Sequence, residues 1–542
     1  MYITITDDKR FLNIRNLTMN EIQILRDNFT KEYEDSWRIK KMGPWAICKE
    51  EFFSKFGLLP FGLWMELIKI IKKYNLQAQF DPKVNECLQD TKLSYNIFKY
   101  YVDSLFKEAT DNNGNPFAPK EYQLEGVFKL IKFRRCCVEV TTSGGKTLMS
   151  YIMFKFLYDI KHSKKCLYIV PNKGLVTQSK EKYDIYENNV HGEHKWKSAI
   201  LYGGMKKNEK KEFESGNYDI LFATYQSLAN RKADFYKDFD VIFIDECHHS
   251  KANSYKNIIQ KCINMKYCFG MTGTFPLEDT YNRFIIESYI GPLMYTLTAF
   301  QLINEEHFAT PIVIVNEILD YATLDEKKAL YIARKFKDRE DMSAGNRLLK
   351  QEIDFSVHNN LRFRYICDLA SKCKHNTLIL FNDVKEGAGY GHRIFDYLKE
   401  NSDKRVFYAD GGTKNEAREF YKSEMEKDLS GNTVFVGSTG CFSEGIDIGN
   451  LWTIILVNSV KSQYIVKQMI GRGMRRFPGK KQVVLFDIVD DLRYGNKGDE
   501  EWIKNNYLWK HHLEREKIYI REKFPVYNQK VAFGELSKYN LT

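Results

Sequence analysis

The sequence predicts an α/β fold with two parallel-sheet lobes in tandem, and the distribution of its apolar segments is the main reason. Short, almost continuously apolar strands alternate with helical stretches in two regions of the chain. The expected strands are 166–170, 219–224, 241–246 and 268–274 in the first region, and 377–381, 405–410, 432–438, 452–458 and 482–488 in the second. Strands of this kind, separated by helices, are typical of a parallel sheet covered on both faces. A more polar and helical segment at about 310–370 separates the two regions.

The flanks of the two lobes indicate further parts, as a chain of 542 residues allows. The stretch "EATDNNGNPFAPKEY" at 108–122 is rich in Asn, Gly and Pro and predicts a linker. Before it, Pro60 can begin a helix with apolar residues on one face, which indicates a small folded domain. A charged, helical stretch after residue 495 is expected to pack back on the second lobe. The expected parts are a small α+β N-terminal domain at 1–110, the first lobe at 111–310, the second lobe at 311–495 and a helical C-terminal extension at 496–542.

The net charge and the cysteines indicate more about the cellular compartment than about the function. The formal net charge of +11 and the pI of about 8.8 fit a polyanionic partner, but also a solvated lysine-rich surface. No apolar run reaches the length of a membrane span, and the first residues lack the apolar core of a signal peptide, so we expect no membrane association. The 11 cysteines are scattered without a C-x-x-C pair, which favours reduced thiols in the cytoplasm and argues against a zinc site.

The stretch "VEVTTSGGKTLMSY" at 138–151 combines a strand end, a glycine-containing turn and the start of a helix. In that setting, backbone N–H groups at the helix N-terminus point toward phosphate oxygens. Lys146 would reach the β- and γ-phosphates of a nucleotide, and the Thr147 hydroxyl would bind Mg²⁺. The strict phosphate-loop pattern is broken because Val140 stands at its first glycine position, so a plain turn is the alternative. The candidate nucleotide ligands of the loop are Thr142, Ser143, Gly144, Gly145, Lys146 and Thr147.

A pair of acids ends the apolar strand in "VIFIDECHHS" at 241–250. Asp245 at the strand tip could hold Mg²⁺, and Glu246 could orient or deprotonate the attacking water. The alternative is a polar loop with solvated acids, but a position roughly 100 residues after the GGKT turn, in the same lobe, favours the functional interpretation. We expect His248 to connect this site with the next strand, which ends in "MTGT". Upstream, the amide of Gln123 could pair with the N6 and N7 edge of adenine, unless it is an ordinary surface residue.

The second lobe contains no GK[ST] turn, so we expect it to hydrolyse nothing by itself. It does contain "STGCFSEGIDIGN" at 438–450 and "QMIGRGMRRF" at 468–477. Arg472 and Arg475 are three residues apart and would share one face if this stretch is helical. Such a pair could act on a γ-phosphate as an arginine finger in cis. The alternative is an ordinary basic helix with solvated arginines.

Eight motifs together carry a family resemblance that none of them carries alone. They are, in order, "EYQ", "TTSGGKT", "IVPNKGLVTQ", "ATYQSL", "DECH", "TGT", "FSEGIDI" and "QMIGRGMR". In order and spacing they resemble the motifs of superfamily 2 helicases and translocases, over about residues 118–490. The resemblance implies two RecA-like lobes, with ATP and Mg²⁺ as cofactors bound between them. The sequence departs from the usual motifs at Val140, Ser143 and Cys247, and none of these changes removes a group that hydrolysis needs.

The same resemblance implies a role for each matching residue. By it, Gln123 recognises adenine, Lys146 and Thr147 bind phosphate and Mg²⁺, Asp245 holds the metal, Glu246 serves hydrolysis, Thr272 and Thr274 couple the lobes, Gly445 and Asp447 line the cleft, and Gln468, Arg472 and Arg475 complete the site.

The N-terminal flank points to one group within this superfamily. The stretch "LLPFGLWMELIKIIKKYNLQAQFDPKVNE" at 58–86 is similar to the N-terminal domain of phage UvsW-type recombination helicases, and the tail "REKIYIREKFPVY" is similar to that group as well. Just upstream, "SWRIKKMGPWAICKEEFF" at 36–53 interleaves aromatic residues with Arg38, Lys40 and Lys41. We expect these three basic residues to contact DNA phosphates. The alternative is a hairpin whose tryptophans belong to the core.

The sequence therefore predicts an ATP-dependent DNA helicase or translocase. By resemblance to the UvsW-type group, it would act on single-stranded, duplex or branched DNA, such as forks, Holliday junctions and R-loops, in recombination, repair or replication. We expect a monomer in the cytoplasm, that of the host if a phage encodes it, with recombination or replication proteins as partners. Three alternatives stay open: a DExH-type RNA helicase, the translocating subunit of a restriction system, and an ATP-gated binding or assembly factor that never unwinds.

Overall fold

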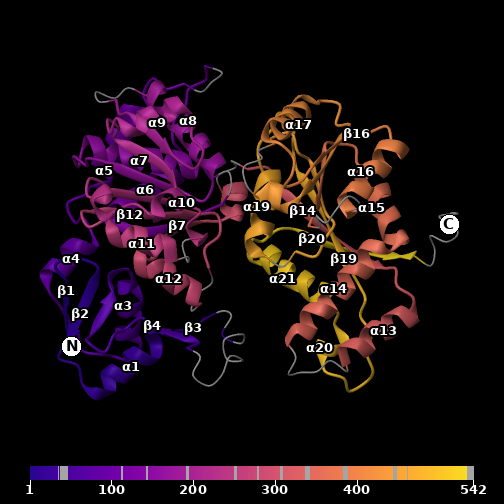
Figure 1. The fold of residues 1–542 in the computed structure, drawn as a ribbon, viewed down its shortest axis with the longest axis horizontal. Helices are drawn as coiled ribbons and strands as arrows, with labels where there is room; N and C mark the ends of the chain where they lie inside the picture. The colour runs from indigo at the N-terminus through magenta and orange to yellow at the C-terminus, as the bar shows by residue number, and fades with distance from the viewer. Residues whose placement is uncertain are drawn as a thin grey trace. The chain divides into compact units, whose positions relative to one another are not determined.

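The computed structural model forms two compact units, Met1–Leu297 and Thr298–Thr542 (Figure 1). The residues that it describes are 1–33, 36, 47–110, 114–141, 144–190, 195–249, 253–276, 280–305, 309–335, 342–382, 389–443, 448–460 and 462–533. The first unit holds the N-terminal domain together with the first lobe, and the second unit holds the second lobe with the C-terminal extension. The limits expected for the four smaller parts stay predictions.

The first lobe is built on a seven-stranded sheet in which all neighbouring strands are parallel, in the order β13-β7-β12-β11-β8-β10-β9. Its strands are β7 (Arg135–Val140), β8 (Cys166–Val170), β9 (Ser198–Leu201), β10 (Ile220–Thr224), β11 (Val241–Asp245), β12 (Tyr267–Thr272) and β13 (Leu293–Leu297). Every residue of β8, β10, β11 and β12 is buried, as a sheet covered on both faces requires. This confirms the fold that the apolar strands predict for this lobe.

The helices of the first lobe follow its strands in the alternation that the sequence indicates. They are α5 (Tyr95–Leu105), α6 (Glu121–Phe133), α7 (Lys146–Asp159), α8 (Lys173–Asn189), α9 (Lys207–Glu214), α10 (Tyr225–Ala229), α11 (Asn253–Lys261) and α12 (Tyr281–Tyr289). Asn172 begins α8 by accepting a hydrogen bond from the Leu175 N–H through its side chain, at 3.0 Å. The start of α8 is therefore set by local capping as well as by packing on the sheet.

The N-terminal domain is a small α+β unit, as expected, with a four-stranded sheet in the order β5-β2-β1-β6 (indigo in Figure 1). Its elements are β1 (Tyr2–Ile5), β2 (Phe11–Arg15), α1 (Met19–Phe29), β3 (Thr30–Glu32), β4 (Lys49–Glu51), β5 (Leu58–Pro60), α3 (Trp64–Lys73), β6 (Gln79–Phe80) and α4 (Pro82–Leu88). Leu67 and Ile70 of α3 are buried, which confirms the predicted apolar face, but Pro60 ends β5 and the helix begins only at Trp64. Thr18 and Glu21 form a capping box that begins α1.

The N-terminal domain and the first lobe share one hydrophobic core. Phe29 and Phe52 both contact Phe284 of α12, with ring centroids 6.3 and 5.8 Å apart. At Gly62 the two backbones meet so closely that a Cβ would lie 1.9 Å from the carbonyl oxygen of Glu287. The domain is therefore fixed to the lobe by close packing, which is why both belong to one compact unit.

The second unit contains another seven-stranded parallel sheet, in the order β16-β17-β15-β18-β19-β14-β20. Its strands are β14 (Ile312–Asp320), β15 (Thr377–Phe381), β16 (Arg405–Ala409), β17 (Thr433–Ser438), β18 (Thr453–Leu456), β19 (Val483–Asp490) and β20 (Val526–Ala532). Its helices are α13 (Leu324–Lys335), α14 (Met342–His358), α15 (Asn360–Lys372), α16 (Tyr390–Asn401), α17 (Asn415–Lys427), α18 (Thr439–Ser443), α19 (Gln463–Gly473), α20 (Glu501–Lys504) and α21 (Tyr507–Arg521). A second parallel-sheet lobe is thereby confirmed.

Two strands of this sheet are missing from the sequence prediction. β14 lies in the segment that the sequence describes as polar and helical, and β20 lies in the C-terminal extension expected to be helical. The two strands pair with each other, and the buried Asn316 donates a hydrogen bond from Nδ2 to Oδ1 of Asn528 at 2.7 Å. This contact satisfies the amide N–H of Asn316, and local sequence does not reveal the neighbour that accepts it.

The C-terminal extension packs back on the second lobe, as predicted, through buried ion pairs. Arg515 of α21 donates from Nε and Nη2 to the two carboxylate oxygens of Asp487 in β19, each at 2.8 Å. Both side chains are almost fully buried, so removal of either would leave an uncompensated charge inside the lobe. Extension and lobe therefore form one folding unit.

Every helix in the described part of the chain is too short or too polar to cross a membrane. Of the 11 cysteines, eight are buried and three, Cys48, Cys87 and Cys373, are partly exposed. All are free thiols in this structure, and burial raises the pKa of Cys136, Cys137 and Cys166 well above its ordinary value.

Candidate nucleotide site

The turn between β7 and α7 has the backbone of a phosphate-binding loop. Gly145 is the N-cap of α7 and has φ of +83°, in the left-handed region that favours glycine. A Cβ at this position would lie 2.1 Å from Nε2 of Gln123, so only glycine fits both the conformation and the space. A Cβ on Gly144 would lie 2.4 Å from Cγ1 of Val140. Thr142 and Ser143 lie outside the described residues.

Gln123 comes from the start of α6 and lies against this loop. Its side chain is 5% exposed, and Nε2 donates to the carbonyl oxygen of Gly144 at 3.2 Å. Its Oε1 accepts from the backbone N–H of Lys120 at 2.8 Å. The structure thus brings together two segments that the sequence separates, although the contact of Gln123 with adenine stays a prediction.

Lys146 and Thr147 open helix α7, where backbone N–H groups lack intrahelical partners. Nζ of Lys146 donates to the carbonyl oxygen of Val140 at 3.3 Å, so the ammonium folds back over the turn. This arrangement suits a polyphosphate with its metal. The positive helix end and the ammonium can bind phosphate oxygens, and the Thr147 hydroxyl can bind the metal. These groups and the tight space around Gly145 both fit a nucleotide.

The two acids follow β11 at the same edge of the sheet as the loop. Because β7 and β11 both flank β12 and all three are parallel, their carboxyl ends meet at that edge. Asp245 is 8% exposed. Burial and the neighbouring Glu246 carboxylate raise the pKa of Asp245 to about 6, and the Lys146 ammonium opposes that rise. A divalent cation beside Asp245 would favour its ionised form.

Glu246 has an unusual backbone conformation for a residue with a side chain. Its φ is +50°, which costs on the order of 1–3 kcal/mol for a residue other than glycine. The Glu246 N–H donates to Oδ1 of Asp245 at 3.0 Å, which helps to hold the turn. Strain of this kind is common where a protein must present a functional group in one orientation.

Glu246 is connected through His248 to the following strand. Nδ1 of His248 lies 2.8 Å from Oγ1 of Thr272 and 3.4 Å from Oε2 of Glu246. Thr272 Oγ1 also accepts from the N–H of Thr274 at 3.0 Å. This confirms the predicted link from the acid pair to the strand that ends in "MTGT". The role of Thr272 and Thr274 in coupling the lobes stays a prediction.

Glu139 near this site was not singled out from the sequence, and Cys247 was noted there only for its place in the acid motif. Glu139 of β7 is 4% exposed and accepts from the Phe275 N–H at 3.2 Å, so it ties the phosphate-loop strand to the segment after β12. Cys247 is fully buried, and its Sγ would lie 3.1 Å from a Cβ on Gly270. Its packing explains why a small apolar residue stands in the acid motif. Only the apolar surroundings of Glu139 in "CCVEV" could have signalled its burial.

The second unit carries the remaining predicted site residues that the structure describes. Gln468 and Arg472 lie in α19, but that helix ends at Gly473, so Arg475 lies beyond it and the two arginines do not share one helical face. Arg472 is 9% exposed. Burial lowers the pKa of Arg475 to about 10, partly offset by Glu426, which leaves the guanidinium charged at neutral pH.

The side chain of Gln468 carries a buried polar atom. Oε1 of Gln468 is buried and has no hydrogen-bond partner among the residues that the structure describes. Such an atom is costly unless something satisfies it. The predicted cleft residues Gly445 and Asp447, and the predicted DNA contacts Arg38, Lys40 and Lys41, lie outside the described residues.

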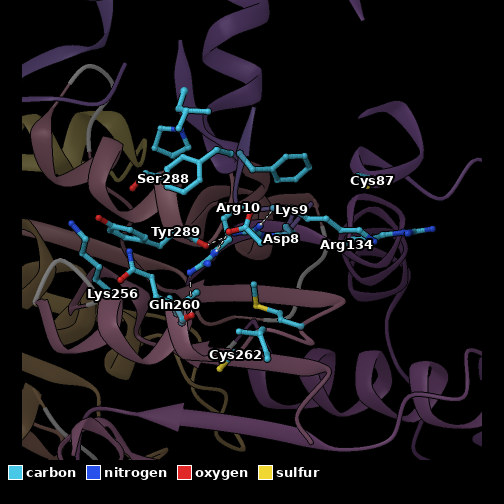
Figure 2. Close-up of a pocket in the computed structure, with 18 of the residues that line it drawn as sticks. Asp8, Lys9, Arg10, Cys87, Arg134, Lys256, Gln260, Cys262, Ser288 and Tyr289 are labelled. Atoms are coloured by element: carbon cyan, nitrogen blue, oxygen red, sulfur yellow. Dashed lines mark hydrogen bonds and ion pairs between the residues drawn. The ribbon is translucent and has the colours of Figure 1, made fainter. Parts of the chain in front are cut away.

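A cavity of about 920 Å³ in the first unit is separate from this site (Figure 2). It lies between the N-terminal domain and the amino ends of β7 and β12, the sheet edge opposite to the phosphate loop. Two of its arginines are engaged within the protein. Arg10 pairs with Asp8 at 2.6 Å, and Arg135 donates to the carbonyl oxygens of Lys9 and Tyr289 at 3.1 and 2.6 Å. The candidate nucleotide site therefore rests on the loop and the acids, not on this cavity.

Comparison with known families covers both lobes. The family described as "Type III restriction enzyme, res subunit" matches residues 116–277, which include the loop and the acid pair. The family described as "Helicase conserved C-terminal domain" matches residues 361–477, which include Arg472 and Arg475. The chain belongs to the superfamily 2 helicases.

This helicase is similar to the ATP-dependent DNA helicase UvsW of Enterobacteria phage T4, with 27% identity over 509 residues, 92% of this chain and 93% of that protein. The crystal structure of T4 UvsW aligns with 98% of this chain and 99% of that chain, at 24% identity and a TM-score of 0.48. A protein of Acanthamoeba polyphaga mimivirus, named for an ATP-dependent RNA helicase activity, is 27% identical over 58% of this chain and 56% of its own length. The DNA-bound type ISP restriction–modification enzyme LlaBIII aligns with 86% of this chain and 36% of that chain, at 15% identity and a TM-score of 0.54, which supports the fold alone.

Proposed function

We propose that this superfamily 2 helicase is an ATP-driven DNA motor that remodels branched DNA, such as forks, Holliday junctions and R-loops, in recombination, repair or replication. The observation that carries the proposal is the extent of the similarity to T4 UvsW, an ATP-dependent DNA helicase. That similarity spans 92% of the chain and therefore includes the N-terminal domain as well as the two lobes. The protein would act as a monomer in the cytoplasm, that of the host if a phage encodes it, together with recombination or replication proteins.

Hydrolysis would take place at the loop and the acid pair of the first lobe. The backbone of Gly144 and Gly145 and the Lys146 ammonium would bind the phosphates, while Thr147 and Asp245 would hold Mg²⁺. Bound Mg²⁺ would neutralise charge on the β- and γ-phosphate oxygens. The Lys146 charge near Asp245 supports this assignment, because it favours the ionised carboxylate that a metal needs.

Glu246 would take a proton from the attacking water while the water oxygen forms a bond to the γ-phosphorus. The bond from that phosphorus to the oxygen bridging to the β-phosphate then breaks, which leaves ADP and inorganic phosphate. Arg472 and Arg475 would stabilise the charge that develops, and Gln468 would supply a further polar contact. The contacts that join Glu246, His248 and Thr272 support a relay of this event to Thr274.

The N-terminal domain would supply the contact with duplex or branched DNA through Arg38, Lys40 and Lys41. Because this domain shares a core with the first lobe, DNA bound to it would keep a fixed position relative to the ATP-hydrolysing lobe. Reversing Lys40 and Lys41 to Glu tests the contact. If both touch phosphates, the slope of log affinity against log salt becomes shallower by about two units. Unchanged binding of branched DNA by the folded double variant would remove this patch from the proposal.

One experiment separates the proposed function from its alternatives. ATP hydrolysis is measured without nucleic acid, then with single-stranded, duplex and branched DNA and with RNA, and strand separation is followed in parallel. We expect DNA to stimulate hydrolysis and branched DNA to be unwound, with Lys146→Ala as the inactive control. Stimulation by RNA alone would identify an RNA helicase. Movement on duplex DNA without strand separation would favour a restriction-type translocase, and DNA binding gated by ATP with neither outcome would indicate an assembly factor.

A further inference from the structure

Lys480 lies in the connection between α19 and β19, and its ammonium joins two segments of the second lobe. Nζ donates to the carbonyl oxygen of Gly449 at 2.9 Å and to that of Arg475 at 2.7 Å. Gly449 follows the motif that contains Asp447, and Arg475 belongs to the arginine pair proposed for hydrolysis. One side chain outside every recognised motif therefore holds the backbones of two motifs together.

The opposite side of this connection is fixed by α17. The Glu426 carboxylate in its last turn accepts from the N–H groups of Gly449 and Asn450 at 2.9 and 3.2 Å. The Asn450 side chain donates in return to the terminal carbonyls of α17, with the shortest contact, 2.8 Å, to Asp428. Glu426 and Asn450 thus join the segment at Gly449 to the end of α17 by several hydrogen bonds.

The carbonyl of Arg475 receives a second donor. Oγ1 of Thr310 donates to it at 3.0 Å, and the Thr310 N–H donates to the carbonyl of Met474 at 2.7 Å. Because α19 has already ended at Gly473, the carbonyl of Arg475 is held by Lys480 and Thr310, while its N–H makes a long hydrogen bond, 3.4 Å, to the carbonyl of Arg472. The orientation of the arginine thus depends on these side chains.

We propose that Lys480 is a positioning residue for ATP hydrolysis, because its ammonium fixes the backbone of Arg475 against the segment at Gly449 and so sets where the Arg475 guanidinium can reach. The inference rests on the proposed role of Arg475 in the transition state. It concerns residues of this chain only, and it predicts that the strength of the contact follows the charge of Lys480.

That charge changes near neutral pH. Burial lowers the pKa of Lys480 to about 7, Glu426 of α17 opposes this shift, and the positive charge of Arg475 adds to it. Thr310 and the Gly449 carbonyl contribute uncharged groups. A charged donor makes a hydrogen bond roughly twice as strong as a neutral one. The hydrogen bond from Lys480 to the Arg475 carbonyl therefore weakens as Lys480 loses its charge, when the pH rises through 7. Turnover should therefore fall over the same pH range.

The test compares Lys480→Met and Lys480→Arg with Lys481→Met as the matched control, since Lys481 is exposed and adjacent. DNA-stimulated kcat, KM for ATP and the affinity for a non-hydrolysable ATP analogue are measured in the full chain from pH 6 to 9. We expect Lys480→Met to lower kcat at pH 6 on the order of 10- to 100-fold, because a displacement of about 1 Å can cost 10²-fold. Analogue affinity should stay unchanged, and the alkaline decline of the wild type should disappear. Lys480→Arg should recover much of kcat and also remove the decline, because its charge does not titrate in this range.

A stability measurement checks the titration without reference to activity. The folded pKa of Lys480 lies near 7 and the ordinary lysine value is 10.5, so between these values the unfolded chain binds the additional proton. Wild-type stability should therefore rise with pH from 7 to 9 relative to Lys480→Met, as followed by thermal unfolding of both proteins.

The outcomes separate the inference from its premise. Wild-type kcat and pH profile in folded Lys480→Met would overturn the inference while Arg475→Ala still loses turnover. Normal kcat in Arg475→Ala would instead overturn the proposed role of that arginine, and the inference with it. Loss of analogue affinity in Lys480→Met with unchanged kcat would also overturn it, because a nucleotide-binding role would then replace positioning.

Discussion

A methyl group added at Gly145 tests the phosphate loop at the point where its geometry is most restrictive. The change to Ala places a side chain on a residue with φ of +83° and puts its Cβ 2.1 Å from Nε2 of Gln123. The left-handed conformation costs an alanine about 1–2 kcal/mol. Gln123 must also move, which endangers its hydrogen bonds to Gly144 and Lys120, each contributing about 0.5–1.5 kcal/mol. The sum is about 2–5 kcal/mol.

That cost applies whenever the loop adopts the conformation that binds phosphate. If the variant relaxes to another conformation, ATP must restore the strained one, and a penalty of 2 kcal/mol already weakens binding by about 30-fold. We therefore expect Gly145→Ala to bind ATP at least about 30-fold more weakly and to unfold more easily. Fluorescent ATP-analogue titration and thermal unfolding measure the two effects. Gly174→Ala is the control, because its Cβ would meet nothing nearer than 3.4 Å at the start of α8, where alanine should be neutral or slightly stabilising.

The contact with Gln123 can be separated from backbone strain by a double-mutant cycle. Combining Gly145→Ala with Gln123→Ala removes the clash but keeps the positive φ, so the two changes should cost about 1–3 kcal/mol less together than their sum. Wild-type ATP affinity in Gly145→Ala would show that the loop does not need the left-handed residue. Strict additivity would show that Gln123 is not what excludes a side chain there.

Three further changes test other parts of the proposal. Lys146→Ala should abolish phosphate release while DNA binding, measured by filter retention, stays largely intact; normal turnover by the folded variant would overturn the nucleotide site. Arg472→Ala and Arg475→Ala should each lower kcat by on the order of 10³-fold with ATP affinity retained; lost affinity at unchanged kcat would make that arginine a binding residue. Deleting residues 1–110 should expose the apolar surface of α12 around Phe284 and give aggregates in size-exclusion chromatography, and a soluble monomer would contradict the shared core.

Much of the sheet architecture could be predicted because buried parallel strands need continuous apolar sequence. The strands β8 and β15 have the bounds expected from the sequence, 166–170 and 377–381. The loop at Lys146 and the acid at Asp245 were also identifiable, since their chemistry is local to a short stretch. Their approach to each other follows from the strand order around β12, and that order depends on long-range pairing.

Features that depend on a distant partner could not be predicted. In β14 the amide N–H of Asn316 is satisfied by Asn528 of β20, and nothing near either residue in the sequence indicates this contact. The left-handed backbone of Glu246 has no sequence signal, because most such positions are glycine. The sequence does not indicate the contacts of Lys480 either, since its partners are backbone carbonyls of residues outside its own turn. Sequence patterns thus predict burial and local chemistry well, but they predict contacts between distant residues poorly.

The position of β14 has a consequence for synthesis on the ribosome. This strand is translated at residues 312–320, but its neighbours in the sheet are β19 at 483–490 and β20 at 526–532. For the time needed to translate about 160 residues, at 5–20 residues per second, both edges of an apolar strand stay without their native partners. A stalled or truncated nascent chain would then present an open template for pairing with other chains. All strands of the first unit have been translated by residue 297, so premature termination within the second unit should yield a folded ATP-binding lobe attached to an aggregation-prone remnant.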